Sequence, residues 1–346
     1  MTDESAVDNE TAATTCPDCG AETVAGDRFC ENCGNDLLLV TGSTPGDTVA
    51  PERRGCVECG AEVDADGFCT QCGFAQPALR DRVELDLGSV AGVSDRGLRH
   101  HRNEDAMALR ATSAVDGGAE HVVAVVCDGV STSDRPDDAS KAAADSAADV
   151  LLAAARSGKD LEVATGDAVA AAQDAVVALA GPGLRNAPAC TYVSAVVSGD
   201  TVTVGWVGDS RAYWLAADGS CQLTVDDSWA QRMIEAGQLA EIDAMADPRS
   251  HALVAWLGAD ATGITAHVRS LRPDGPGVVL VCSDGLWNYL PEADELAEAA
   301  LPKAVDAPFA VAGELTALAI DRGGHDNITV VVVPFPLSSS TKGTDS

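Results

Sequence analysis

The chain has 346 residues, of which 46% are hydrophobic, and its 22 basic and 54 acidic side chains give a formal net charge of −32. This charge argues against nucleic acid or an anionic membrane as a partner, because both attract cationic surfaces. The N-terminus, MTDESAVDNE, is acidic and lacks the apolar run of a signal peptide, and no segment approaches the roughly 20 apolar residues of a membrane span. We therefore expect a cytoplasmic protein with one large core.

Eight of the twelve cysteines lie in the first 72 residues, in two copies of a paired CxxC pattern. The ligands that we predict are Cys16, Cys19, Cys30 and Cys33 in the first copy, and Cys56, Cys59, Cys69 and Cys72 in the second. A reducing compartment favours metal binding over disulfides. Four thiolates at this spacing suit one structural Zn²⁺ per copy, two in all. An iron–sulfur cluster is the weaker alternative.

These copies resemble a double zinc ribbon, and each is too short to hold a core without its metal. We predict an acidic tail at 1–15, ribbons at 16–40 and 56–76 with a linker at 41–55 between them, a large domain at 77–335, and a tail at 336–346. The linker is assigned from its content of Gly, Pro and Thr.

Helices and strands of the large domain follow from hydrophobic patterns. We predict strands within 83–94 and at 121–127, 191–198, 200–207, 211–215, 277–282 and 327–333, and helices at 137–156, 161–180 and 227–237 with two more within 291–320. The segment 191–215 is typical of an antiparallel meander with Gly-Asp turns. Clustered strands and paired helices favour an α+β fold in which two antiparallel sheets carry helices outside.

Aspartates stand where apolar strands meet turns. Asp128, followed by Gly129, ends one strand, Asp209 and Asp284 each follow another, and Asp326 precedes the last. Packed sheets could bring these ends to one edge. Clustered carboxylates repel each other unless a cation neutralises them, and hard oxygen ligands suit Mg²⁺ or Mn²⁺. The sequence therefore indicates a divalent metal centre.

The joint order of RNEDA, CDGV, GWVGDSRAYWL, CSDGLW and GGHDNITVVVV resembles the metal-dependent serine/threonine protein phosphatases of the PPM (PP2C-like) family, bacterial members in particular. The resemblance spans about residues 83–334. It implies a four-layer α-β-β-α sandwich and hydrolysis of phosphoserine or phosphothreonine by a water that the metal ions activate. The implied substrates are phosphorylated proteins, such as a kinase and its targets, while the ribbons would dock a protein partner or regulate the enzyme.

The same resemblance implies roles for individual residues. The metal ligands would be Asp128, which bridges two ions, the Gly129 carbonyl, Asp284, Asp326 and, for a third ion, Asp209. Glu104 and Asp105 would hold metal-bound waters and complete the catalytic set. Asn327 is expected to brace its turn rather than to bind metal.

Three positions depart from the family pattern. His100 stands where members carry a phosphate-binding arginine, so either Arg99 or His100 is expected to contact the phosphate. Val130 follows Gly129 where eukaryotic members have a histidine, and Asn288 replaces a carboxylate found in some members. These changes leave open a phosphoprotein-binding adaptor with weak or no activity. A phosphatase gated by redox-labile zinc thiolates is a third possibility.

The other four cysteines, Cys127, Cys190, Cys221 and Cys282, lack the Cys-x5-Arg loop of a cysteine phosphatase. We expect them to be small buried apolar residues.

Overall fold

The computed structural model describes residues 13–15, 21–24, 30, 32, 37, 39–45, 56, 59–63, 69–73, 79–112 and 120–337. The chain divides into two compact units, Met1–Val40 and Thr41–Ser346. In the first unit, β1 (Ala13–Thr15) pairs antiparallel with β2 (Glu22–Val24), so a strand occupies part of the predicted tail. Cys16, Cys19 and Cys33, and the predicted C-terminal tail beyond residue 337, lie outside the described residues.

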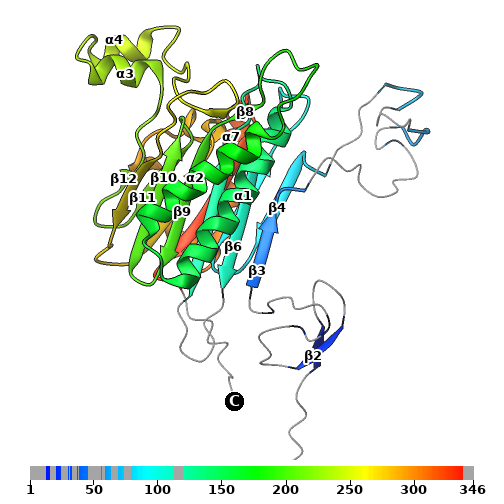
Figure 1. The fold of residues 1–346 in the computed structure, drawn as a ribbon, viewed down its shortest axis with the longest axis vertical. Coiled ribbons are helices and arrows are strands. Elements are labelled where there is room, and N and C mark those ends of the chain that lie inside the picture. Colours follow the sequence, from blue (N-terminus) through cyan, green and yellow to red (C-terminus); the bar gives the residue numbers. More distant parts are fainter. Residues whose placement is uncertain are drawn as a thin grey trace, which may run out of the picture. The chain divides into compact units, whose positions relative to one another are not determined.

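Six strands form the first sheet, in the order β14-β10-β9-β7-β6-β3. They are β3 (Leu39–Ser43), β6 (Ala106–Thr112), β7 (His121–Cys127), β9 (Tyr192–Ser198), β10 (Thr201–Val207) and β14 (His267–Leu271). The helices α1 (Pro136–Ser157) and α2 (Leu161–Val177) cover its outer face (Figure 1). Because both faces are covered, β7 is an almost continuous apolar run.

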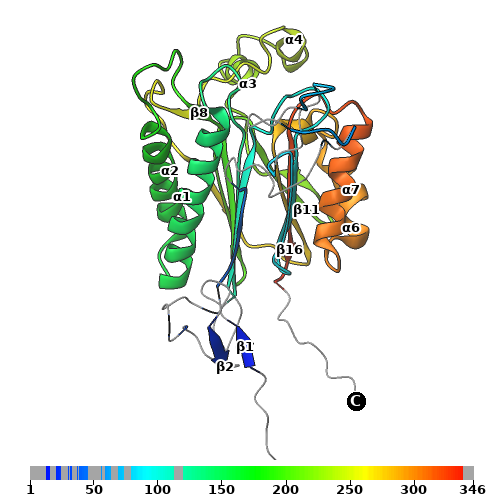
Figure 2. The same cartoon turned by 90° about the vertical axis from the view of Figure 1, so that its right-hand side faces the viewer.

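Six strands also form the second sheet, in the order β12-β11-β15-β16-β5-β4. They are β4 (Arg82–Asp86), β5 (Ala91–Asp95), β11 (Arg211–Leu215), β12 (Cys221–Gln222), β15 (Gly277–Cys282) and β16 (Ile328–Phe335). Its outer face carries α6 (Ala293–Ala304) and α7 (Pro308–Asp321). Figure 2 shows the two sheets edge-on between the helix pairs, which confirms the predicted four-layer sandwich.

Shorter elements connect the layers. They are α3 (Trp229–Glu235), α4 (Glu241–Ala246), α5 (Asp284–Trp287), and the small pair β8 (Ala189–Cys190) and β13 (Leu257–Gly258). Among the described residues, no helix combines the length and the apolar content that crossing a bilayer requires.

Among the described residues, apolar cores hold the layers together. The first lies between the sheets and includes Met107, Val204 and Val331, all fully buried. The second, with Leu280 and Leu315, joins the second sheet to its helices. Burial of each such side chain stabilises the fold by roughly 1.5–3 kcal/mol. The sheets are therefore firmly packed on both faces, which fixes the positions of their strand ends.

The structure corrects parts of the predicted strand pattern. The segment 83–94 forms two strands rather than one, because the chain turns at Gly88 with φ 82°. β9 and β10 pair around Gly199 as predicted, but β11 lies in the other sheet. The chain crosses between the sheets at Gly208, where φ is 107°. Residues 41–43, in the predicted linker, belong to β3.

Candidate active site

The first sheet brings three predicted residues to one end. β6 begins where β7 ends, because Ala106 lies opposite Cys127 in their antiparallel register. Asp105, just before β6, and Asp128, just after β7, therefore share an edge. Asp209 follows β10, which runs parallel to β7 since both pair antiparallel with β9.

The second sheet supplies the other two aspartates in the same way. Cys282 at the end of β15 lies opposite Val330 near the start of β16. Asp284 is the first residue of α5 and lies two residues after the end of β15, and Asp326 lies two residues before β16.

The five aspartates act on each other electrostatically. Burial raises the pKa of Asp128 well above its ordinary value, and repulsion from Asp105, Asp284, Asp326 and Asp209 raises it further. Burial also raises the pKa of Asp284, with added repulsion from Asp326 and Asp209. The pKa of Asp105 rises to about 6 and that of Asp209 to about 7, in both cases chiefly through burial. The structure thus gathers the acidic residues that the sequence placed at separate strand ends.

Two of these carboxylates have a buried oxygen with no hydrogen-bond partner in the described part of the chain. Asp105 accepts hydrogen bonds from Ser283 Oγ and Thr329 Oγ1 on Oδ2, each at 2.7 Å, but its Oδ1 is unpartnered. Asp284 accepts from Asn288 Nδ2 at 3.3 Å on Oδ2, and its Oδ1 is likewise unpartnered. A buried oxygen of this kind is destabilising unless another group satisfies it. An all-oxygen donor set suits a divalent cation such as Mg²⁺ or Mn²⁺.

Glu104 is held on three sides. Its main-chain N–H donates to Asn327 Oδ1 at 2.7 Å. Its carboxylate accepts from Arg102 Nε at 3.2 Å and from Ser131 Oγ at 2.7 Å. Sequence reasoning missed Ser131, because no local pattern distinguishes this serine from its neighbours in VSTSD. The predicted bracing role of Asn327 fits these contacts.

Gly129 is closely surrounded by backbone atoms, which leave no room for a side chain. A Cβ at this position would come within 2.6 Å of the Pro136 carbonyl oxygen and 2.7 Å of the Glu104 carbonyl oxygen. Glycine is therefore required here by the first turn of α1 and by the acidic segment, residues 103–107. Its predicted carbonyl contact with metal remains a prediction.

The two candidate phosphate-binding residues contact the loop before β16. His100 Nε2 lies 3.1 Å from Asp326 Oδ1. Arg99, which is exposed, has its Nη2 3.3 Å from His325 Nε2. Both side chains thus lie beside the Asp326 segment, and their contact with phosphate remains a prediction.

Three of the four remaining cysteines are buried as expected. Burial raises the pKa of the Cys127 and Cys282 thiols, which disfavours the reactive thiolate. Cys221 is exposed, so that part of the prediction is wrong. It lies in β12, a short strand at the edge of its sheet.

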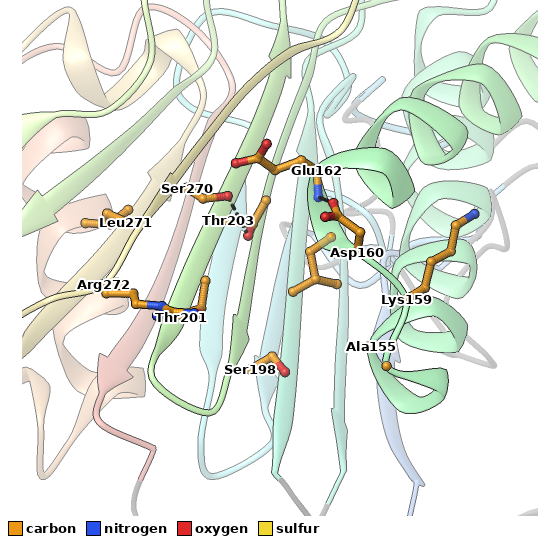
Figure 3. Close-up of a pocket in the computed structure, with 12 residues that line it drawn as sticks. Ala155, Lys159, Asp160, Glu162, Ser198, Thr201, Thr203, Ser270, Leu271 and Arg272 are labelled. Atoms are coloured by element: carbon orange, nitrogen blue, oxygen red, sulfur yellow. Dashed lines mark hydrogen bonds between the residues drawn. The ribbon is translucent and has the colours of Figure 1, made fainter.

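A hollow of about 540 Å³ lies outside this site, beside β9, β10 and β14 and the start of α2 (Figure 3). It contains none of the five aspartates. Its cations are already paired, Lys159 with Asp167 and Arg272 with Asp200.

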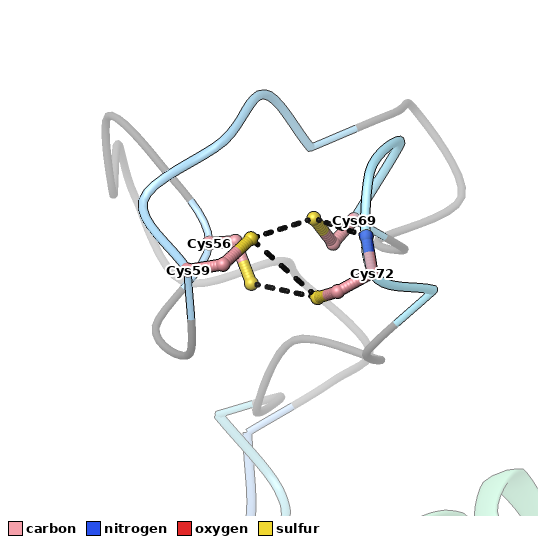
Figure 4. Close-up of side chains that lie close together, drawn as sticks. All are labelled: Cys56, Cys59, Cys69 and Cys72. Carbon is pink, nitrogen blue, oxygen red and sulfur yellow. Dashed lines mark hydrogen bonds between the residues drawn. The ribbon is translucent and has the colours of Figure 1, made fainter.

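The second cysteine copy forms a compact cluster (Figure 4). Cys59 Sγ lies 3.4 Å from Cys69 Sγ and 3.6 Å from Cys72 Sγ, and Cys56 Sγ lies 3.7 Å from Cys72 Sγ. Main-chain N–H groups of Cys72 and Gln71 donate to Cys69 Sγ and lower the pKa of that thiol. Four sulfurs so placed suit tetrahedral Zn²⁺.

This cluster is tighter than the acidic one. In the described part of the chain, the four cysteines are the only group of three or more His, Cys, Asp or Glu residues whose ligand atoms all lie within 4.8 Å of one another.

Comparisons with known proteins match both the ribbon region and the large domain. Residues 16–73 match the double zinc ribbon family, and residues 98–303 match the protein phosphatase 2C family. The serine/threonine phosphatase stp of Listeria innocua is 34% identical over 161 residues, which are 46% of this chain and 62% of that protein. The serine/threonine protein phosphatase PstP of Mycobacterium tuberculosis is 28% identical over 72% of this chain and 45% of that protein. The chain therefore spans less than two thirds of these relatives.

Solved structures show the same architecture. The PPM Ser-Thr phosphatase MsPP of Mycobacterium smegmatis, crystallised with cacodylate, has a TM-score of 0.56 and 27% identity, covering 72% of this chain and 99% of that one. The catalytic domain of PstP, crystallised with two manganese ions, has a TM-score of 0.52 and 26% identity, covering 70% of this chain and 96% of that one. With its family match extending over more than half of its length, the chain belongs to the protein phosphatase 2C family.

Proposed function

We propose that this chain is a Mg²⁺- or Mn²⁺-dependent protein phosphatase that hydrolyses phosphoserine and phosphothreonine in cytoplasmic proteins, a Ser/Thr kinase and its targets among them. The observation that carries the proposal is the gathering of aspartates from two sheets, of which Asp105 and Asp209 are buried, with buried unpartnered oxygens on Asp105 and Asp284. The names of the relatives and the manganese in the PstP structure support it.

The residues that would hold two cations are Asp128, Asp284, Asp326 and the carbonyl of Gly129, with Asp209 near a third. Divalent cations, when bound, lower the pKa of water and stabilise negative charge on phosphoryl oxygens.

The chain's own residues orient the reactants. Ser283 and Thr329 fix one oxygen of Asp105, which leaves Oδ1 available to accept a hydrogen bond from water. Ser131 holds the Glu104 carboxylate in a fixed direction. The exposed guanidinium of Arg99 can donate two hydrogen bonds to a phosphate. No cysteine is required as nucleophile.

The zinc ribbons have a different task. Their four-sulfur sites leave no open coordination position, so zinc there would be structural. We propose that they dock a protein partner, and their acidic surroundings make nucleic acid a poor candidate.

Hydrolysis of p-nitrophenyl phosphate, and phosphate release from phosphoserine and phosphothreonine peptides, test the proposal in the full-length protein. Turnover should require Mn²⁺ or Mg²⁺ and fall roughly 100-fold or more in Asp284→Asn, since a ligand to the cation contributes several kcal/mol. Asp174→Asn, on the exposed face of α2, is the matched control and should keep full turnover. Equal, negligible turnover by wild type and Asp284→Asn would instead favour a phosphoprotein-binding adaptor.

A further inference from the structure

The second zinc ribbon lies in the sequence between two buried residues that contact the same acidic segment. Thr44 precedes the ribbon and is 1% exposed, and Arg80 follows it and is 2% exposed. Neither belongs to a motif that the proposed function uses. Both have contacts to residues 103–107, which include Asp105.

Thr44 fixes the start of β6. Its main-chain N–H donates to the Met107 carbonyl at 2.9 Å, and its Oγ1 accepts from the Met107 N–H at 2.9 Å. Thr44 directly follows β3, which lies beside β6 at the edge of the first sheet. Because Met107 is two residues from Asp105, this double contact restrains the acidic segment from one side.

Arg80 restrains the same segment from the other side. Its Nη2 donates to the carbonyl oxygens of Asp105 at 3.4 Å and Asp137 at 3.2 Å. Its own carbonyl accepts from Asn103 Nδ2 at 3.0 Å, and Asn103 Oδ1 accepts from the Asp105 N–H at 3.2 Å. A buried guanidinium is costly unless acceptors or a counter-charge compensate it. Nη1 lies 4.0 Å from Asp137 Oδ2, and within the described residues neither Nη1 nor Nε has a hydrogen-bond partner, so Nη2 makes the side-chain contacts. Arg80 therefore binds the acidic segment through both its side chain and its main chain.

We infer that Thr44 and Arg80 are positioning residues for Asp105. We also infer that zinc in the second ribbon favours the docked state, in which both residues keep the contacts described above. This rests on the proposed function. Along the chain, the two anchors are 36 positions apart. The cluster holds Cys56 and Cys72 with their sulfurs 3.7 Å apart. Zinc binding would hold these two cysteines together and so reduce the unconstrained chain between Thr44 and Arg80 to about 20 residues. By loop-closure scaling, this shortening raises the equilibrium constant for docking of the two anchors about twofold.

Hydrogen exchange of peptides covering residues 103–110, measured by mass spectrometry on the full-length protein without Mg²⁺ or Mn²⁺, tests the anchors. Thr44→Val and Arg80→Met should each speed exchange about tenfold, because each leaves buried backbone groups unpaired. Arg80→Lys should restore part of the protection. Calorimetry should show weaker Mn²⁺ binding in the same variants.

Thr203→Val is the matched control. Thr203 is as buried as Thr44 and its hydroxyl bonds Ser270, in strands outside the acidic segment. It should leave exchange at 103–110 unchanged. If Thr44→Val and Arg80→Met exchange as slowly as this control, the positioning role is refuted, whether or not the protein hydrolyses p-nitrophenyl phosphate.

The proposed effect of zinc on the two anchors is tested separately. Cys59→Ser, with zinc loss confirmed by elemental analysis, should speed exchange at 103–110 about twofold. Cys221→Ser, an exposed cysteine outside the ribbons, should not. Zinc loss without any change in exchange would overturn the link between ribbon and acidic segment. Changed exchange in a protein that hydrolyses nothing would support the link and refute only the proposed function.

Discussion

Asn327 Oδ1 accepts the main-chain N–H of Glu104 at 2.7 Å, although the two residues are 223 positions apart. The same amide donates through Nδ2 to the carbonyl oxygens of Arg96 at 2.8 Å and Arg102 at 3.1 Å. One buried side chain thus ties the start of β16 in the second sheet to the loop that carries the acidic segment. With the bonds from Ser283 and Thr329 to Asp105, it joins the two halves of the candidate site.

Asn327→Leu should therefore destabilise the protein. It leaves the N–H and two carbonyl groups without their partner, which should lower the free energy of unfolding by about 3 kcal/mol. Urea unfolding followed by circular dichroism measures this. Asn186→Leu is the control, because Asn186 is exposed and its side-chain Nδ2 donates one hydrogen bond, to the Thr132 carbonyl. Equal stability of the two variants would contradict the bracing role.

Asp284→Asn should have opposite effects with and without divalent metal. Without metal, burial and the charges of Asp326 and Asp209 disfavour the Asp284 carboxylate, so a neutral amide should stabilise the fold by about 1–2 kcal/mol. With Mn²⁺ at 100 times its dissociation constant, wild type should gain about 2.7 kcal/mol, and the variant much less. Thermal unfolding in EDTA and in excess Mn²⁺ compares them. An equal gain from Mn²⁺ in both proteins would exclude Asp284 as a ligand.

Sequence patterns predicted the bounds of a strand correctly where the strand is strongly apolar. β7 and β15 have the predicted bounds, because continuous valine-rich runs are typical of strands covered on both faces. Asp128 and Asp284 were predicted as site residues because each comes where one of these apolar runs ends. β6, with the sequence AMALRAT, was not predicted, although it lies between β7 and the edge strand β3 in the first sheet. Its alanine, methionine and leucine favour helix, and tertiary packing overrides that preference.

The groups that hold the acidic residues could not be predicted from local pattern. Ser283 and Thr329 reach Asp105 across 178 and 224 positions, and each is an ordinary polar residue next to an apolar run. The sheet change at Gly208 was missed because a Gly-Asp turn signal does not specify which strand the chain pairs with next. Such contacts depend on register and layer packing, which one sequence does not encode locally.

Zinc content offers a direct test of the ribbons. The full-length protein should hold two zinc ions per chain, and Cys69→Ser should hold one, because three sulfurs bind far more weakly than four. Cys69 is chosen since it is buried and its sulfur accepts two main-chain N–H groups. Elemental analysis after dialysis measures the ratio. Two zinc ions in Cys69→Ser, or one in the control Cys221→Ser, would contradict the assignment.

Gly129→Ala tests whether the backbone atoms around Gly129 are as close as the structure shows. The added methyl group would come within 2.6 Å of the Pro136 carbonyl oxygen and 2.7 Å of that of Glu104, and both belong to backbone that cannot rotate away. The first turn of α1 and the acidic segment must separate, which should lower the free energy of unfolding by about 2–3 kcal/mol and weaken Mn²⁺ binding.

Gly181→Ala supplies the comparison for that substitution, because a Cβ there meets no atom within 4 Å. Gly181→Ala should leave the free energy of unfolding unchanged or raise it by up to about 1 kcal/mol, because alanine reduces the conformational entropy of the unfolded chain. Urea unfolding and Mn²⁺ calorimetry on both variants separate a local clash from a general effect of alanine. If Gly129→Ala unfolds at the same urea concentration as Gly181→Ala and binds Mn²⁺ as tightly as wild type, α1 does not abut the acidic segment as described.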